Sequence, residues 1–364
     1  ALRPLEDKIL SKPSRGHFER PWQSEVPPFS ESVEKDILYP CDDEDNGIVS
    51  VGWRGPSGVS ELYDLTGCSL LLKYLTDNSV SPLQKEFVEI DDPYACNVDY
   101  SLIENSVSTI SMMFSGVPIP KIPLVKGHLK KVLADVHANG IDMKRMETVI
   151  NRHQLETLSN LETMPHDSIA YMLIGDAIYG RDNKDLEQRL NAIDELKKLA
   201  LEKEDYWLNL LKKYMIDAPS VIINARPSIK KQKEIAEAEL KRVEERRKTL
   251  GESGLKQKEK DLQEAIARNE VPIPDEVLTR VPVPGTDSIN FHTVKSYMTN
   301  GNEQHPRFDV NKLPRFTCLD HLNTNFVMMF VLMDTSSLAR EARPYMPLIL
   351  EAIGECPIER NGEL

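Results

Sequence analysis

At 364 residues and 40% apolar composition, the chain is long enough for two or three domains with a sizeable buried core. Its formal net charge of −13 argues against a nucleic-acid surface, and no apolar run approaches the roughly 18 residues of a membrane span. The five cysteines are widely spaced and include no CxxC pair, which is typical of reduced thiols in a cytosol-like compartment.

The two ends of the chain give an expectation about its surroundings. Residues 1–34 are rich in proline and charge, and we interpret them as an extended connector with Trp22 and Phe29 as possible anchors. The chain begins with Ala, and it stops just after an apolar helical pattern. We therefore expect both ends to belong to something longer.

Residues 35–226 predict one α+β domain. The expected strands come first and cover residues 36–40, 47–54, 86–90, 96–103 and 108–114. A Leu-rich buried helix over 61–75 is expected between the second and third of them. Helices are then expected over residues 125–139, 143–162, 167–179, 185–201 and 203–214, with Gly140 and Gly180 as signals for helix ends. A last strand is expected over residues 220–225. Strands followed by a helical layer favour an antiparallel or mixed sheet covered on one face.

Residues 227–285 predict a charged helical hairpin. About half of its central stretch, 228–270, is charged with the two signs interleaved, and a sparse apolar track runs through it at helical spacing. Gly251 and Gly254 interrupt this track, so we expect two antiparallel helices. The narrow track favours a strap against the chain's own domains, and a partner-binding coiled coil stays open as an alternative.

Residues 286–364 predict a linker and the start of a further unit. The sequence is patternless to residue 315, and then a strongly apolar strand over 325–332 and a helix over 341–353 are expected. One strand and one helix cannot bury a core alone, so we expect the remainder of this unit to be absent.

The first candidate for chemistry is His153 with Glu156, which together spell H-x-x-E on a predicted helix. Thr157 stands where a zinc motif of the form H-x-x-E-H requires its second imidazole, so a surface pair is favoured. The Gly-rich stretch 52–58 lacks the Lys-Ser/Thr of a phosphate-binding loop, and a loop that ends a strand is the simpler interpretation.

Three further candidates are weaker. Asp167, beside His166, follows a proline at a helix start, where a cap is expected. Asp320 and His321 are neighbours that could form an acid/base couple, but no nucleophile lies at a fixed spacing from them. Cys68 lies on the apolar helix, where a buried thiol is expected. We assign no catalytic, cofactor-binding or metal-binding residue to this chain.

A set of short segments occurs in an order that matches a known family. The segments are Arg20-Pro21-Trp22, 52–56, 115–118, 140–142, 163–167, 206–214, 221–225, the charged hairpin, 320–324, 334–338 and 343–348. In this order they resemble the insulinase/pitrilysin family of zinc metallopeptidases, in its presequence-protease branch and, more narrowly, its cytosolic eukaryotic members. The resemblance covers nearly the whole chain.

The resemblance implies a four-unit enzyme whose two halves close around a peptide, with H-x-x-E-H in the first unit. This chain corresponds to the second unit, over about residues 20–226, the connecting hairpin, and the opening strand and helix of the third. It contains no H-x-x-E-H, and the counterpart of the zinc helix, 65–72, carries no ligand. The implied function is a non-catalytic segment that walls the peptide-degrading chamber and joins its halves, with zinc only in the parent protein.

The resemblance also implies partners and a location. The partners are the catalytic first unit and the C-terminal half of the same protein, with a peptide as the parent's substrate and neither nucleic acid nor membrane involved. A scaffold or assembly subunit of the same fold, without peptidase activity, is the alternative. The thiols and the family branch favour the cytoplasm, with the mitochondrial matrix as second choice.

Overall fold

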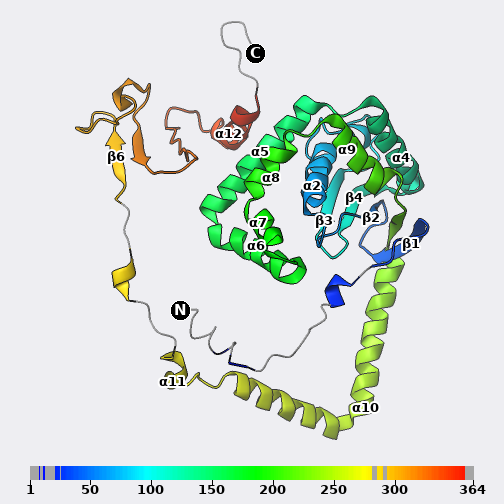
Figure 1. Ribbon diagram of the computed structural model, residues 1–364. Helices are drawn as coiled ribbons and strands as arrows, with labels where there is room; N and C mark the ends of the chain where they lie inside the picture. Colours follow the sequence, from blue (N-terminus) through cyan, green and yellow to red (C-terminus); the bar gives the residue numbers. More distant parts are fainter. Residues whose placement is uncertain are drawn as a thin grey trace. The chain divides into compact units, whose positions relative to one another are not determined.

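Residues 8, 11–12, 21–24, 26–280, 285–289 and 293–356 are described by a computed structural model (Figure 1). The chain falls into two units, residues 1–283 and 284–364. Most of the predicted connector before residue 21 and the segment 281–284 lie outside the described residues, as do the last eight positions.

The first unit is built on a five-stranded mixed sheet with the strand order β1-β5-β2-β4-β3. Its strands are β1 (Val33–Pro40), β2 (Asn46–Arg54), β3 (Asn97–Ile103), β4 (Thr109–Pro118) and β5 (Ser220–Ser228). β1 and β5 are parallel, and the other neighbours are antiparallel. The first strand of the unit therefore pairs with its last, and the predicted α+β class with a mixed sheet is confirmed.

Alternation along the strands explains which face of the sheet is covered. In β2, Val49, Val51 and Trp53 are buried, and the residues between them are half-buried. In β4, Ile110 and Met112 are buried, while Met113 between the strand's inward positions is exposed. This period of two gives the sheet one apolar face, which the helices cover.

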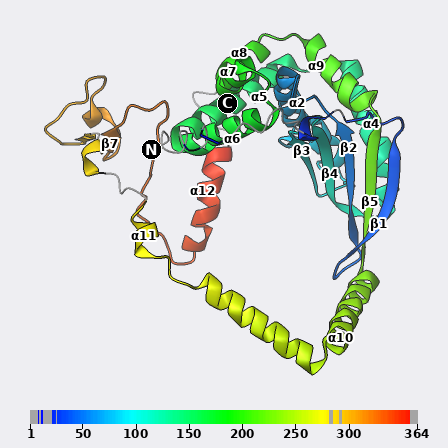
Figure 2. The same cartoon turned by 60° about the horizontal axis from the view of Figure 1, so that its bottom comes forward.

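The helices of the first unit follow β2 and β4 in the chain. They are α2 (Leu62–Thr76), α3 (Pro82–Phe87), α4 (Ile122–Asn139), α5 (Met143–Thr163), α6 (Pro165–Tyr179), α7 (Asn183–Leu190), α8 (Ala192–Leu199) and α9 (Glu204–Leu211), which runs into a π-helical turn, Lys212–Ile216. α4 contacts β2 and β5, and α2 contacts β3 (Figure 2). The sheet is thus joined to the helical layer through α2 and α4.

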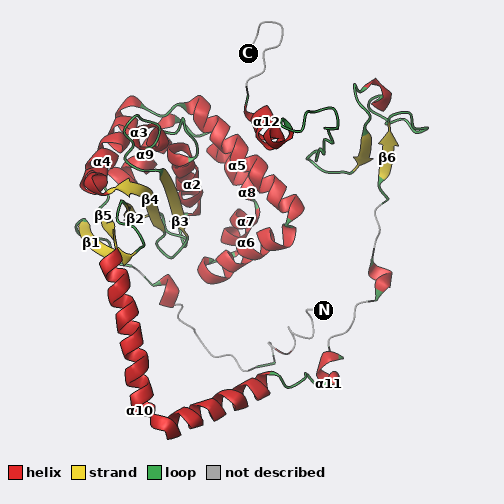
Figure 3. Cartoon of the chain, turned by 180° about the vertical axis from the view of Figure 1, so that it is seen from behind, coloured by secondary structure: helices red, strands yellow, loops and turns green. Residues whose placement is uncertain are grey.

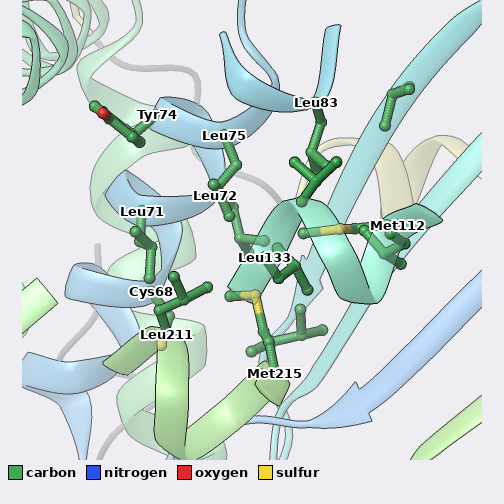
Figure 4. Packing of buried hydrophobic residues seen from close by; sticks show 14 of the residues in the cluster. Cys68, Leu71, Leu72, Tyr74, Leu75, Leu83, Met112, Leu133, Leu211 and Met215 are labelled. Atoms are coloured by element: carbon green, nitrogen blue, oxygen red, sulfur yellow. The ribbon is translucent and has the colours of Figure 1, made fainter. Parts of the chain in front are cut away.

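The core lies where α2 meets the sheet and α4. Leu71, Leu72 and Leu75 of α2 are fully buried in one cluster with Met112 of β4 and Leu133 of α4 (Figure 4). Burying a Leu side chain contributes about 1.5–3 kcal/mol relative to leaving it exposed, so this Leu-rich helix anchors the unit.

One predicted strand of the first unit is wrong. The run 86–90 was expected to be extended, but residues 86 and 87 form the end of α3 and residues 88–90 form the turn that follows it. Ser81 is extended and Pro82 occupies the first helical turn, a strong start signal for a helix. Leu83 and Phe87 stand four residues apart and are both fully buried, so the apolar positions follow a helical period.

Another expectation that changes is the single helix over 185–201. It is divided into α7 and α8 at Asn191, whose backbone is not helical. The Asn191 side chain donates a hydrogen bond to the Glu187 carbonyl at 2.9 Å, which ends α7. Asn competes with the helical backbone in this way at many helix ends.

The charged stretch forms α10 (Ile229–Asn269), which starts at Ser228, whose hydroxyl accepts from the Lys231 amide. Gly251 breaks the helix with φ 60° and ψ −177°, so the expected helices and break are confirmed. The antiparallel packing is not: no residue of α10 is buried, and the two arms diverge at the break (Figure 3). Leu240 remains 69% exposed, because the apolar track is too sparse to hold the arms together.

The rest of the chain contains short elements. The helix α11 (Asp275–Leu278) ends the described part of the first unit before residue 281. In the second unit, β6 (Lys295–Met298) and β7 (Cys318–His321) form an antiparallel pair, and α12 (Met346–Glu355) follows a 3₁₀ turn at Arg343–Tyr345. The predicted strand over 325–332 is not formed, since this segment pairs with no described strand and Leu332 is 99% exposed.

Candidate functional site

The H-x-x-E pair lies on α5, against α2. His153 Nδ1 is 3.5 Å from Glu156 Oε2, and the same oxygen accepts a hydrogen bond from Lys73 Nζ at 2.6 Å. The hydrogen bond from Lys73 holds the pKa of Glu156 below its usual range, and burial together with the Lys73 charge lowers the pKa of His153. The carboxylate is already neutralised by a lysine, so the pair joins α2 to α5 and lacks the features of a metal site.

The family resemblance implies a zinc ion in the parent protein. Zinc sites in enzymes take three protein ligands, and structural sites take four. Within the ranges that the structure describes, no three His, Cys, Asp or Glu side chains come together in a way that could hold a metal ion. These residues do not fit zinc, and we derive no chemical step through it.

His166 and Asp167 form an exposed pair at the start of α6, with Nε2 3.7 Å from Oδ1. The expected cap is corrected, since Met164 occupies the capping position and Asp167 lies in the first turn. An acid in the first turn interacts favourably with the helix dipole, which accounts for the residue without a functional role.

Asp320 and His321 lie on β7 and engage different partners. Asp320 Oδ1 accepts from Ser296 Oγ at 2.5 Å, while His321 Nδ1 lies 3.2 Å from Nε2 of His305. His305 is buried beside Tyr297 and Phe308. The two residues therefore do not form an acid/base couple, and the sequence carried no signal for the His305 contact because it falls in a patternless stretch.

The remaining candidates are structural as well. Cys68 is fully buried, and burial raises the pKa of its thiol far above the physiological range, so it is no nucleophile. In the Gly-rich stretch, the Gly55 amide donates to the Ser108 carbonyl at 2.8 Å and the Gly58 amide to the Asn105 carbonyl at 3.1 Å. These amides hold the loop after β2 against the loop before β4 and do not face a ligand.

A network of acids and hydroxyls joins α2 to α9 and the π-helical turn. Glu61 Oε1 accepts from Lys213 Nζ at 3.1 Å and from Tyr214 Oη at 3.3 Å, and Tyr206 Oη donates to Asp64 Oδ1 at 3.2 Å. Burial raises the pKa of Tyr214 to about 12. Each acid already has a donor, so the network fixes the helices in place.

Two cavities in the described part of the first unit are candidates for a binding site. One, of about 300 Å³, lies beside the start of α5, and three of its charged groups are engaged: Asp142 caps α5, Arg145 donates to the Tyr74 carbonyl, and Arg152 pairs with Asp77. The other, of about 350 Å³, lies between the sheet and α4 and is lined by residues from three distant stretches: 51–53, 126–133 and 215–222, together with Ser32. Sequence reasoning missed it, because only the pair Lys126 and Lys130 was visible as a local pattern.

None of the helices in the described ranges combines the length and the apolar composition that crossing a membrane would require.

Comparison with protein-family models finds no match. Among curated proteins, the chain is 31% identical over 354 residues to an uncharacterized protein of Caenorhabditis elegans and 28% identical over 371 residues to one of Schizosaccharomyces pombe. These alignments cover 96% and 99% of this chain but 35% of each relative. The chain therefore spans about a third of the length of the curated relatives it matches.

Among solved structures, the chain resembles M16 (pitrilysin-family) peptidase domains, inactive ones among them. An M16-like peptidase structure from Alicyclobacillus acidocaldarius gives a TM-score of 0.46 at 16% identity, covering 62% of this chain and 51% of that one. The M16 inactive domain from Pseudomonas fluorescens gives 0.44 at 16%, covering 56% and 46%. An inactive peptidase domain from Bordetella parapertussis gives 0.43 at 12%, covering 51% and 93%.

Proposed function

We propose that this chain is a non-catalytic segment of a longer zinc metalloendopeptidase-like protein of the insulinase/pitrilysin family. In that protein it forms part of the wall of the chamber in which peptides are degraded, and it contains the segment that connects the two halves. The proposal rests on the ordered set of segments that resemble this family, and that set is the observation that carries it.

The positions of those segments in the fold support the proposal. Several of them fall at the joints of the first unit, where backbone geometry is most demanding. Gly140 has φ 89° at the end of α4, and Asp142 two residues later accepts from two amides at the start of α5. Residues 115–118 end β4, which includes Gly116 at φ 63°. Shared joints of this kind are expected when two chains share a fold.

The connecting role draws its support from α10. This helix begins directly after β5, buries no residue of its own, and carries an apolar track along a mainly charged surface. Isolated helices of this kind gain most of their stability from tertiary packing, so exposed Leu240 and Leu262 favour a partner surface elsewhere in the longer protein. A connector between two bodies fits these features.

The chemistry of the proposed parent protein would be metal-activated hydrolysis, and its zinc ligands would lie outside this chain. The test uses the purified 364-residue chain. We expect no stoichiometric zinc by elemental analysis and no cleavage of a mixed peptide library by mass spectrometry. Cleavage that a chelator abolishes would contradict the non-catalytic assignment.

The alternative, an assembly subunit without peptidase activity, is favoured by one feature, the exposed apolar run Phe326 to Met333 in the second unit. The two proposals differ in the full-length protein. Chelator-sensitive peptide cleavage by that protein supports the peptidase, whereas a full-length protein that lacks H-x-x-E-H and cleaves nothing supports the scaffold.

A further inference from the structure

The cavity between the sheet and α4 has the character of a binding site for a small molecule. Its walls include Val51 and Trp53 of β2, Leu129 and Leu133 of α4, and Ile222 of β5, all buried. Figure 4 shows Leu133 together with Met215, a further lining residue, in the apolar cluster. The cavity is partly open to solvent, and its volume of about 350 Å³ lies near the lower end of small-molecule sites.

Positive charge lies at one side of this cavity. Lys126 and Lys130 stand one turn apart on α4 and both line it. Lys126 is already used, because its Nζ lies 2.7 Å from Glu34 Oε2, and Glu34 also accepts from Asn224 Nδ2 at 2.9 Å. The hydrogen bond from Lys126 holds the pKa of Glu34 below its usual range, so this pair is charged and mutually neutralised.

Lys130 is the second cation at this side, and its charge also helps to lower the pKa of Glu34, after the larger effect of Lys126. It is exposed, and it forms no ion pair with any residue in the described part of the chain. Asp217, which is also exposed, contributes one negative charge to the lining. Asp217 repels each negative charge on a ligand, so a single carboxylate at Lys130 meets less repulsion than a ligand with two or more negative charges.

We propose that this cavity binds a small apolar group that carries one carboxylate. The apolar group packs against Trp53, Leu129 and Leu133, and the carboxylate lies at Lys130, where the cavity meets solvent. Two sources share this chemistry, a free carboxylic acid and the C-terminal apolar residue of a peptide. The inference goes beyond the proposed function and does not depend on it.

The first experiment compares acids with their amides by isothermal titration calorimetry on the 364-residue chain. Octanoate represents the free acid and N-acetylphenylalanine the peptide C-terminus, with octanamide and N-acetylphenylalaninamide as neutral partners. We expect one of the two acids to bind with a stoichiometry of one molecule per chain. Its amide should bind about tenfold more weakly, because it lacks one charge-assisted contact. The acid that binds identifies the source. Equal binding of acid and amide, or binding by neither acid, overturns the proposal.

The second experiment places the ligand. Lys130→Gln should weaken binding of that acid about tenfold. Lys131→Gln is the matched control, since Lys131 is the next residue, pairs with Asp135 at 3.4 Å and does not line the cavity. Ala218→Leu should fill the cavity and abolish binding.

Thermal melting by circular dichroism establishes that each variant is folded before binding is compared. If Ala218→Leu does not fold, the comparison of Lys130→Gln with Lys131→Gln decides the proposal. Unchanged affinity in folded Lys130→Gln means that the carboxylate does not lie at Lys130, and the proposal is then wrong.

Discussion

Asp185 is a buried acid whose surroundings explain its charge state. It lies in the first turn of α7, and Arg181 donates to it from the main-chain amide at 3.0 Å, from Nε at 2.9 Å and from Nη2 at 3.0 Å. The hydrogen bonds from Arg181 are the main reason that the pKa of Asp185 is lowered. A carboxylate with several donors is stabilised in its charged form, which makes this residue an acid-sensitive support for α7.

We predict that Asp185→Asn lowers the free energy of unfolding at pH 7 by about 1 kcal/mol, a value reduced because the Arg181 side chain is half exposed. The folded pKa lies below the unfolded one, so the carboxylate contributes fully above an unfolded pKa of about 3.9. That contribution is lost as the pH falls through the folded pKa. The difference between wild type and variant, measured by urea unfolding, should therefore be constant from pH 7 to 5 and shrink below pH 4.

Asp194→Asn is the control, since Asp194 pairs with Lys197 on the surface with 63% of its side chain exposed. Its effect on unfolding should be within the error of the measurement. A difference for Asp185→Asn that persists undiminished at pH 3 would show that the loss comes from packing and not from charge.

At the scale of elements, the break in α10 has a local cause. Gly251 adopts φ 60° and ψ −177°, a conformation that residues with a Cβ avoid, and an added Cβ would meet nothing within 4 Å. Space is therefore not what requires glycine here, and the backbone preference of this one residue accounts for the break. Gly254, three residues later, remains helical, although the sequence indicated a break at either glycine.

We predict that Gly251→Ala converts α10 into one continuous helix. Spin labels at the exposed positions Glu237 and Glu264 should then be about 40 Å apart, as a rise of 1.5 Å per residue predicts. The distance is measured by double electron–electron resonance, and it should be shorter in the wild type. The background chain carries serine in place of the accessible cysteines, which are Cys41, Cys96, Cys318 and Cys356.

Gly254→Ala serves as the matched control, because it adds the same methyl group to a position that is already helical. The label distance should stay at the wild-type value in this variant, with a small gain in helicity. A wild-type distance that already equals that of a straight helix would contradict the break.

Two strand predictions failed in apolar runs. Residues 86–90 contain apolar positions compatible with either period, and the start signal at Ser81 and Pro82 produced a helix that ends at Phe87, inside this run. The run 325–332 is apolar enough for a buried strand, but a strand forms only beside a partner strand, and residues 326–332 belong to neither sheet of the described part of the chain. Propensity alone therefore overestimated this element.

At the scale of the whole molecule, β5 decides whether the first unit can form. It lies between β1 and β2 and pairs with both, so about 180 residues of chain must fold before the sheet is complete. The first turn of α10 adds hydrogen bonds to the turn between β1 and β2, from the Ile229 amide to Glu44 and from the Gln232 side-chain amide to Asp42.

We predict that a shortened chain of residues 26–236 folds by itself. Its melting temperature, followed by tryptophan fluorescence from buried Trp53 and Trp207, should lie within about 5 °C of the corresponding transition of the full chain. A chain that ends at residue 219 lacks β5 and should not melt cooperatively. If the longer of the two failed to fold, the arms of α10 or the second unit would be part of its core.

The sequence by itself determined the α+β class, most strands and helices of the first unit, and the absence of an H-x-x-E-H motif. These follow from local periodicity, glycine and proline signals, and residue types at fixed spacing, all of which are written in neighbouring residues. Only the tertiary structure decided the pairing of β1 with β5, the divergence of the two arms of α10, and the cavity beside Lys130. Each of these depends on contacts, or on missing contacts, between residues far apart in the chain, and no local pattern records them.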